Sequence, residues 1–378
     1  MSAVERVRVL VLIKGLGLGG AERLLERSIP HLDRERFDYH LAYLLPWKDA
    51  LVAPFRAAGI PVHCLDYRRT ADVGVIGRLA ALLRRERIEL VHAHLPVPGV
   101  LARLARRRGA VRHVVYTEHS MPSHHRAFSR ALNAATYRMN DAVIAVSDGI
   151  AREVAGYLRG ARNGSGRLFT IPNAVDVEAL ERVPVGREAV RREFGFPEGA
   201  RLVVHIGNLR PVKGHADLLA AARRVVDRDP LARFLLVGTG PLAARLAAEA
   251  RRLGLDGRVV FAGFREDATR LLAAADLYVL ASLQEGMPVS LLEAMALGRP
   301  AVLTRVGSIP EVAVDGETAR LVAPRDPAGL ADAMVELLGD PARRARMGEA
   351  ARERARRRYG MAQMVAAVED VYRRVVAA

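Results

Sequence analysis

The sequence predicts an α/β protein built from two doubly wound domains, and three features of the chain support this prediction. Short apolar runs of strand length alternate with longer amphipathic runs of helix length along the whole chain. The alternation occurs twice, and a charged stretch over residues 176–200, rich in proline and glycine, separates the two occurrences. A length of 378 residues also suits two domains of ordinary size. We therefore expect one Rossmann-like domain over residues 1–180 and a second over residues 181–360, facing one another across a cleft.

The first half contains apolar runs short enough to be buried strands and longer runs with helical periodicity. The predicted strands are Val7–Ile13, Tyr39–Leu45, Leu90–His94, Val114–Thr117 and Ala142–Val146, and the predicted helices are Ala21–Leu32 and Gly77–Arg87. Strands that alternate with helices form parallel sheets joined by right-handed crossovers. Ligands of such sheets bind beyond the carboxyl ends of the strands, so the loops that follow these strands are the candidates for function.

The same pattern returns in the second half. The predicted strands are Leu202–Ile206, Phe234–Val237, Val259–Phe261, Leu277–Leu280 and Ala301–Thr304, and the predicted helices are Asp217–Asp227, Leu242–Leu253, Val289–Leu297 and Gly329–Leu338.

The composition excludes several classes of protein. Hydrophobic residues make up 51% of the chain and charged residues 26%, which leaves no compositional case for disorder. Cys64 is the only cysteine, which excludes an intrachain disulfide framework and a cysteine-based metal cluster. No segment reaches the roughly 18 uninterrupted apolar residues of a spanning helix, and the N-terminus does not have the pattern of a signal peptide. We expect a cytoplasmic enzyme.

The formal charge of +16 needs an explanation, because it is typical of proteins that bind anionic partners. Only three of the 58 basic residues are lysine, so part of the charge reflects a coding bias toward arginine. Aromatic residues are too few (5%) to serve as stacking platforms for single strands, and we do not expect nucleic-acid binding. Arg103, Arg106, Arg107 and Arg108 form a short basic stretch for which we predict weak contact with anionic membranes, at the inner membrane face; the alternative is a solvated helix end.

A glycine-rich loop follows the first strand, with Gly15, Gly17, Gly19 and Gly20 before a helix. This spacing matches the dinucleotide-binding fingerprint, which also requires an acidic residue at the end of the second strand. The sequence has Leu44-Leu45-Pro46-Trp47 there, without a carboxylate. We therefore expect the backbone of this loop to approach another ligand at the start of the helix, with pure turn geometry as the alternative.

Histidines follow or end two of the first-half strands. His92 and His94 lie two apart and hence on one face of a strand, a spacing that metal sites use, but no further cluster of ligands follows at later strand ends. His119 directly follows a strand, in Thr117-Glu118-His119-Ser120, and should lie at its carboxyl end. His124 and His125 are adjacent in a loop and should be solvated.

The second half carries cations and carboxylates after neighbouring strands. Arg210 and Lys213 lie three residues apart between Gly207 and Gly214, directly after a strand, and can converge on an anion. Glu285 and Glu293 follow a later strand, in the loop and in the next helix respectively.

The backbone amides that begin that helix attract phosphate oxygens, and a carboxylate suits a pair of vicinal hydroxyls. Together these groups predict a site for a nucleotide-sugar.

These motifs make the sequence resemble the retaining glycosyltransferases of family 4, which have the two-domain GT-B fold. The E-x7-E element runs from Glu285 to Glu293, and the family's arginine and lysine lie in G-N-L-R-P-V-K-G-H. The I-P-N-A-V-D and G-S-I-P-E-V segments are also similar, whereas the glycine loop and T-E-H-S match more loosely. The resemblance covers nearly the whole chain and is strongest over residues 200–325. It also implies that a final helix, residues 361–378, returns to pack on the first domain.

The resemblance implies a catalytic set and a donor-binding set of residues. The catalytic residues would be His119, Arg210, Lys213 and Glu285. The donor-binding residues would be Gly17, Gly19, Gly20, Gly207, Gly286, Met287, Pro288, Val289, Ser290 and Glu293. Glu293 would hold the ribose hydroxyls, Glu285 and His119 would contact the transferred sugar, and the two cations would neutralise the diphosphate.

The activity implied is transfer of a hexose-type sugar from a nucleotide donor, UDP before GDP, to a glycan or lipid-linked acceptor of the cell envelope. We expect no cofactor and no metal, because Arg210, Lys213 and helix amides would take the place of a cation at the diphosphate. Two alternatives remain: an epimerase that acts on nucleotide-sugars with the same fold, and a protein that binds nucleotide-sugars without turnover.

Overall fold

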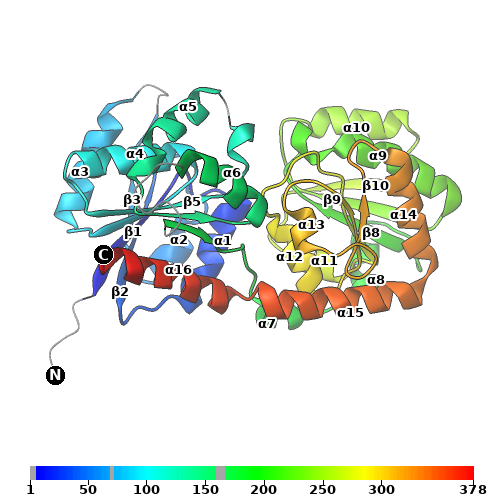
Figure 1. Cartoon of the computed structure of the whole chain (residues 1–378). Coiled ribbons are helices and arrows are strands. Elements are labelled where there is room, and N and C mark those ends of the chain that lie inside the picture. The colour runs from blue at the N-terminus through cyan, green and yellow to red at the C-terminus, as the bar shows by residue number, and fades with distance from the viewer. Residues whose placement is uncertain (1–5, 69–71, 126, 159–166) are drawn as a thin grey trace. The chain divides into compact units, whose positions relative to one another are not determined.

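The computed structural model describes residues 6–68, 72–125, 127–158 and 167–378, which form two compact units (Figure 1). Unit 1 comprises the chain up to Ala174 together with Met361–Ala378, and unit 2 comprises Val175–Gly360. The boundary thus falls at Ala174–Val175, whereas the sequence places it after residue 180. Residues 176–200 belong to unit 2 and contain helices α7 (Val177–Glu181) and α8 (Arg187–Glu193).

Unit 1 contains a seven-stranded parallel sheet in the order β3-β2-β1-β4-β5-β6-β7. Its strands are β1 (Val7–Ile13), β2 (Phe37–Tyr43), β3 (Val62–Cys64), β4 (Leu90–His94), β5 (His113–Glu118), β6 (Ala142–Ala145) and β7 (Leu168–Thr170). The order reverses between β1 and β4, which pair directly, as with Val11 opposite His92. Such a reversal opens a crevice at the carboxyl edge of a sheet.

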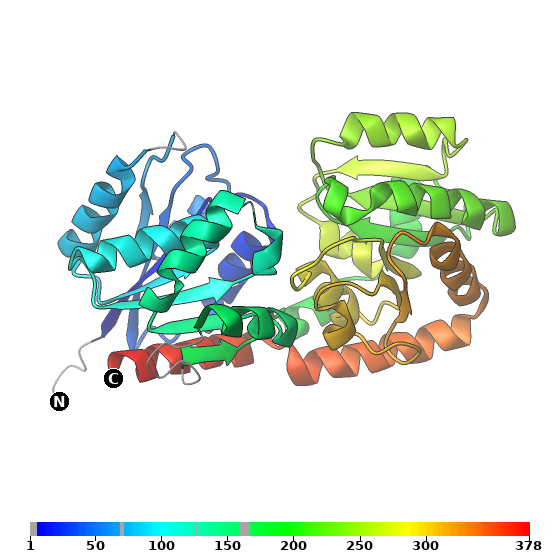
Figure 2. The ribbon, with the colours of Figure 1, turned by 45° about the horizontal axis from the view of Figure 1, so that its top comes forward.

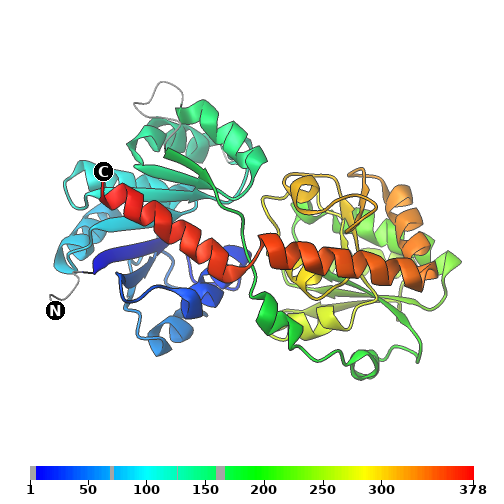
Figure 3. The same cartoon turned by 60° about the horizontal axis from the view of Figure 1, so that its bottom comes forward.

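Helices cover both faces of this sheet. They are α1 (Gly20–Ser28), α2 (Val52–Ala57), α3 (Gly74–Arg85), α4 (Pro96–Arg107), α5 (Ala127–Thr136), α6 (Asp148–Leu158) and α16 (Met361–Val376), with short 3-10 turns at Ile29–His31, Pro122–His124 and Tyr137–Met139. Figure 3 shows α16 crossing the face of the sheet that also carries α1. The α16 residues Val371, Tyr372 and Val375 are buried in the same apolar cluster as β1 and β2, so the C-terminal helix is part of the core of unit 1.

Unit 2 contains a six-stranded parallel sheet in the order β10-β9-β8-β11-β12-β13. Its strands are β8 (Arg201–Ile206), β9 (Ala232–Val237), β10 (Val259–Gly263), β11 (Leu277–Leu280), β12 (Ala301–Thr304) and β13 (Arg320–Val322). The order reverses between β8 and β11, which pair through Val203 and Leu277. The crevice of this sheet therefore lies between the loops that follow these two strands.

The helices of unit 2 pack on both faces of its sheet. Besides α7 and α8 they are α9 (His215–Arg228), α10 (Ala243–Arg252), α11 (Ala268–Ala273), α12 (Val289–Ala296), α13 (Ile309–Val312), α14 (Pro327–Gly339) and α15 (Pro341–Arg358), with a 3-10 turn at Pro211–Lys213. Helices α9 and α14 lie side by side (Figure 2) and share a buried cluster with α10 and the sheet. Helix α12 packs instead against α15.

The structure confirms the predicted fold class, two parallel-sheet Rossmann-like domains, but adds strands that the sequence does not reveal. Strands β3, β7 and β13 have three residues each, and each contains partly exposed residues. Because they are this short and include a polar residue, none stands out in the sequence as a continuous apolar run. Within the described residues no helix combines the length and the apolar character that crossing a membrane requires.

Fewer arginines of the predicted basic stretch, at the end of α4, lie at the surface than the sequence suggested. Arg103 is 0% exposed: its guanidinium donates to Asn140 Oδ1 (2.8 Å) and Asn133 Oδ1 (2.7 Å) and stacks over Tyr116. Arg106 is partly buried and forms an ion pair of 2.8 Å with Asp141. The prediction counted four exposed arginines, but helical periodicity places only Arg107 and Arg108 on the solvent face.

Candidate active site

Lys213 and Glu285 form an ion pair at the carboxyl edge of the unit 2 sheet. Lys213 follows β8, Glu285 follows β11, and the ammonium Nζ lies 2.6 Å from Glu285 Oε1. Glu285 Oε1 also accepts a hydrogen bond of 2.6 Å from the hydroxyl of Ser282, a fully buried residue. Because β8 and β11 are neighbours at the reversal of strand order, these two loops meet although 72 residues separate the charges.

Two glycines let the loops approach this closely. Gly214 has φ 64°, and a Cβ atom there would overlap the carbonyl oxygen of Ala281. Gly307 has φ 53°, and a Cβ atom there would overlap the carbonyl oxygen of Glu285. Both positions combine a left-handed backbone with contact to another backbone. The loop that carries Lys213 and the loop after β12, which contacts Glu285, therefore each depend on glycine.

The predicted diphosphate cations differ in their surroundings. Arg210 is exposed and precedes the 3-10 turn Pro211–Lys213, whereas the Lys213 side chain is 20% exposed and engaged by Glu285. Backbone hydrogen bonds hold the turn, since Lys213 N donates to Arg210 O (3.0 Å) and Leu283 N donates to Val212 O (2.8 Å). The two cations therefore occupy one short, fixed loop.

Helix α12 begins beside Glu285 and places the predicted donor-binding residues. Gly286 is held through its carbonyl, which accepts from the amide (3.3 Å) and the hydroxyl of Ser308. Met287 and Pro288 are buried, and Pro288 precedes the first helical residue, Val289.

Deeper in α12, Ser290 accepts a 2.7 Å hydrogen bond from Tyr278 OH and donates to Ile206 O (3.3 Å), which ties the helix to β8 and β11. Glu293, in the same helix, is buried. Tyr278 thereby fixes the orientation of the helix start.

Gly207 begins the loop after β8, and a pair of buried histidines lies beneath this loop. Gly207 packs against the backbone of Gly238, where φ is 139°. His205 donates from Nδ1 to Val279 O (3.0 Å) and packs edge-on against His215 at 4.7 Å between ring centroids. Burial lowers the pKa of His205 to about 3 and that of His215 to about 4, so both rings are neutral beneath Lys213.

In unit 1, His119 follows β5 at the carboxyl edge, as predicted. Its Nε2 shares a hydrogen bond of 2.9 Å with Nδ1 of His94, the last residue of β4. Burial lowers the pKa of His119 to about 4, which keeps the ring neutral at pH 7. His92 lies two residues before His94 in β4. Its Nδ1 shares a hydrogen bond of 2.6 Å with Tyr372 OH, and its Nε2 shares one of 2.7 Å with Thr117 Oγ1.

The glycine loop of unit 1 lies against a lysine that the sequence did not single out. Gly17 precedes Gly19, the residue before α1, and Gly20 is the first residue of that helix. The Lys48 side chain passes close to Gly15, and Leu16 N donates to Lys48 O (2.7 Å). The loop thus forms the turn between β1 and α1, and the approach of a ligand to its backbone stays a prediction.

The expectation that His125 is solvated is wrong. Its side chain is 8% exposed, its Nε2 lies 3.4 Å from Glu118 Oε1, and it shares a 3.0 Å hydrogen bond with Ser120. Glu118 is itself fully buried and accepts from Tyr116 OH (3.0 Å). A buried carboxylate attracts the nearest donor, and no local pattern in the sequence signals that requirement.

The structure thus brings Lys213, Glu285 and Ser282 into direct contact within unit 2, and His119 and His94 within unit 1. Ser282 lies three residues before its partner Glu285, in the loop after β11, and the sequence did not single it out, whereas His94 pairs with a residue 25 positions later, after the next strand. A cationic loop, a buried carboxylate and the start of a helix at one sheet edge provide groups that can bind a diphosphate and hydroxyls of a sugar.

Two family profiles match the chain. The profile described as Glycosyltransferase Family 4 matches residues 18–179, and the profile described as Glycosyl transferases group 1 matches residues 200–340. The first match lies within unit 1 except for its last few residues, and the second lies within unit 2.

Relatives of known activity match over most of their length. The chain is 31% identical over 308 residues to N-acetyl-alpha-D-glucosaminyl L-malate synthase of Bacillus anthracis, covering 80% of this chain and 78% of that protein. It is 26% identical over 300 residues to UDP-Gal:alpha-D-GlcNAc-diphosphoundecaprenol alpha-1,3-galactosyltransferase of Escherichia coli, covering 76% and 77% respectively.

Solved structures share the fold. The crystal structure of Anabaena HepE in complex with UDP-glucose superposes with a TM-score of 0.86 at 23% identity, covering 99% of this chain and 100% of that chain. A glycosyltransferase from Rickettsia africae superposes with a TM-score of 0.83 at 17% identity, covering 98% and 99%.

Proposed function

Since the chain belongs to glycosyltransferase family 4, we propose that it moves a hexose-type sugar from a nucleotide-diphosphate donor to an acceptor hydroxyl with retention of configuration. The Lys213–Glu285 pair, at the reversal of strand order in unit 2, supports this function best. It places a cation and a carboxylate, both largely buried, where a doubly wound sheet binds its ligand.

The chemistry follows from how charge develops during the reaction. As the bond between sugar and phosphate breaks, negative charge grows on the leaving diphosphate. Lys213, Arg210 and the amides at the start of α12 would stabilise that charge without a metal ion, because they are already oriented when the reaction begins.

The remaining groups would hold the donor in place. When the diphosphate arrives, Lys213 gains a second anionic partner, and Glu285 becomes available to hydroxyls of the transferred sugar. Glu293 would accept hydrogen bonds from the ribose hydroxyls, and neutral His119 would contact the sugar from unit 1. Front-face attack, with a leaving phosphate oxygen taking the acceptor proton, would retain the configuration.

For the donor we favour UDP over GDP, and for the acceptor a glycan or a lipid-linked sugar. The name of the E. coli relative gives UDP-Gal as donor and a lipid diphosphate as acceptor, which supports both choices. We place the reaction in the cytoplasm, with weak contact to the inner membrane face.

The membrane contact rests on two residues of the predicted basic stretch and on two apolar side chains that the sequence did not single out. Arg107 and Arg108 remain exposed at the end of α4, and Phe128 (78% exposed) and Leu132 (40% exposed) lie four residues apart on α5. Sedimentation with anionic and neutral liposomes, at low and high salt, tests the contact. Binding that does not depend on lipid charge would contradict it.

Donor binding and transfer test the main proposal. Thermal unfolding with UDP, GDP and NAD should show stabilisation by UDP and none by NAD, because tight ligands stabilise the folded state by mass action. Sugar transfer should then require an acceptor and survive EDTA.

Two other outcomes would replace the proposal. Conversion of the donor sugar without any acceptor would indicate an epimerase. Donor binding without turnover, with every acceptor tried, would indicate a binding protein.

A further inference from the structure

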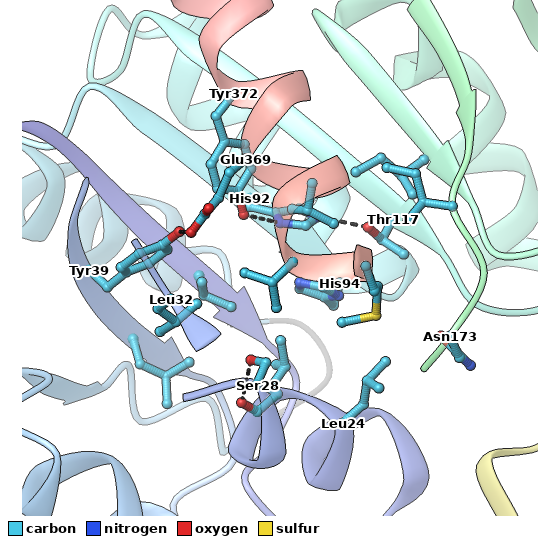
Figure 4. A pocket seen from close by; sticks show the side chains of 18 of the residues that line it. Leu24, Ser28, Leu32, Tyr39, His92, His94, Thr117, Asn173, Glu369 and Tyr372 are labelled. Atoms are coloured by element: carbon cyan, nitrogen blue, oxygen red, sulfur yellow. Dashed lines mark hydrogen bonds between the residues drawn. The ribbon is translucent and has the colours of Figure 1, made fainter. Parts of the chain in front are cut away.

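Unit 1 contains a cavity between α1, α16 and the face of the sheet (Figure 4). The space that the centre of a water-sized molecule can occupy in it is about 80 Å³, and the cavity is partly open to solvent. Its walls come from β1, β2, β4 and β5 on one side and from residues such as Leu24, Leu25 and Val368 of the two helices on the other. The His94 ring lies within it, and His119 lies on its wall.

Most polar groups on the walls are already paired with one another. Tyr39 OH donates to Glu369 Oε1 (2.6 Å), and both nitrogens of His92 are engaged by Tyr372 and Thr117. These groups have little capacity left for a ligand. The rest of the lining is predominantly aliphatic, so the cavity favours an apolar occupant.

His40 and His94 are the exceptions, because His40 Nδ1 and His94 Nε2 are both buried without a hydrogen-bond partner in the structure. His94 is 5% exposed, and its Nδ1 is bonded to His119. Burial and the two neighbouring histidines lower the pKa of His94, so the ring is neutral. The free nitrogen either donates or accepts, depending on the tautomer, and a hydroxyl group can satisfy it in both cases.

We propose that this cavity binds an unbranched aliphatic chain that carries a hydroxyl group, with the chain between α1 and α16 and the hydroxyl on His94. The inference goes beyond the proposed function, because the donor chemistry uses His119 at the wall of the cavity but assigns no ligand to its apolar interior. Two sources could supply such a chain: the apolar part of the acceptor, or a separate amphiphile.

The direct test is calorimetric titration of the full-length protein with straight-chain 1-alkanols of increasing length. Each added methylene should lower Kd about fourfold, which corresponds to burial of about 0.8 kcal/mol per CH₂, until the cavity is full. Beyond that length the affinity should stop rising. Because no donor is present, failure of donor binding would leave this result unaffected, and the two proposals can fail separately.

A variant that fills the cavity tests the proposal, and the same substitution in unit 2 is its matched control. Val368→Phe adds a ring at the cavity wall, and Val335→Phe makes the same change at a half-buried valine on α14 of unit 2. Val368→Phe should weaken alkanol binding at least tenfold, whereas Val335→Phe should bind like wild type. Leu25→Phe, on the opposite wall, repeats the test if Val368→Phe does not fold. Equal binding by wild type and a folded cavity variant would overturn the proposal.

The hydroxyl assignment has its own comparison. Wild type should bind 1-hexanol about fivefold more tightly than 1-chlorohexane, because only the alcohol can pair with His94, and one hydrogen bond contributes about 1 kcal/mol. His94→Phe keeps a ring in the same place and should bind the two compounds alike. If His94→Phe keeps the wild-type preference for the alcohol, the assignment is wrong.

Transfer assays with methyl and octyl glycosides as acceptors separate the two sources. If the chain belongs to the acceptor, the octyl glycoside should have the lower KM, and Val368→Phe should remove that advantage. If a separate amphiphile binds, the two acceptors should have similar KM, and the alkanol affinities above should still hold.

Discussion

Replacing Lys213 by methionine removes the ammonium group from the Lys213–Glu285 pair while keeping most of the aliphatic stem. The Glu285 side chain is 8% exposed, so the substitution leaves a largely buried carboxylate without its cation. Removing one partner of a fully buried pair costs about 3–5 kcal/mol. Lys213 is 20% exposed and Ser282 still donates to Glu285, so we expect a smaller loss, about 1–3 kcal/mol of unfolding free energy.

A double-mutant cycle isolates the interaction. Glu285→Gln alone should also destabilise the protein, and the double variant should be more stable than the sum of the single effects predicts, by about 1–2 kcal/mol. Urea unfolding of wild type, the two single variants and the double variant measures this coupling, provided that the four proteins have the same slope of unfolding free energy against urea concentration. Ser282→Ala serves as a reference for losing only a hydrogen bond to a charged group.

The same variants test catalysis. Lys213→Met should lower kcat by about 10²–10³, equivalent to about 3–4 kcal/mol, with a smaller change in donor affinity, because the cation matters most when charge develops on the diphosphate. Strictly additive stabilities together with a wild-type kcat for Lys213→Met would refute the reasoning, since the pair would then be neither coupled nor catalytic.

Further substitutions test four separate features. Gly214→Ala should destabilise the protein by about 2–4 kcal/mol in urea unfolding, because φ is 64° and the added Cβ overlaps a backbone carbonyl; unchanged stability would contradict the tight turn. Glu293→Ala should weaken donor binding by calorimetry by about 1.5–3 kcal/mol, if ribose hydroxyls bond to the charged acceptor, while changing kcat less. Arg103→Met should cost about 2–4 kcal/mol, because it leaves buried hydrogen-bond acceptors unpaired, whereas Arg107→Met, at the surface, should stay within about 0.5 kcal/mol of wild type. Burial lowers the pKa of His205 to about 3, so below about pH 6.5 the unfolded chain takes up a proton that the folded chain does not. The unfolding free energy should therefore fall toward acid by up to about 1.4 kcal/mol per pH unit from this residue between pH 6.5 and 3, and His205→Phe should reduce that slope.

The positions of the candidate residues along the chain could be predicted because they follow from local rules. Apolar periodicity located β1, β4, β11 and β12 at the bounds that the structure shows. Parallel strands share one carboxyl edge, so the residues after β8 and β11 had to lie on the same side of one sheet. Gly214 was visible in the sequence as the residue that follows Lys213, and the structure shows that it adopts a left-handed backbone there.

Pairings between distant segments could not be predicted in the same way. Nothing near Lys213 indicates that its ammonium contacts Glu285, and nothing near His92 indicates that Tyr372, 280 residues later, completes its hydrogen bonds. Arg103 belongs to a basic run, yet the packing of α4 against α5 buries it.

The sequence by itself therefore determined where the longer strands and helices form, that the strands run parallel, and at which sheet edge the polar residues gather, because hydrophobic periodicity and strand direction are properties of short segments. Only the tertiary structure decided which charges pair, which histidines are neutral and where a cavity remains. Those features depend on burial and on side-chain packing between segments, and both arise only when the sheet and its helices close around a common core.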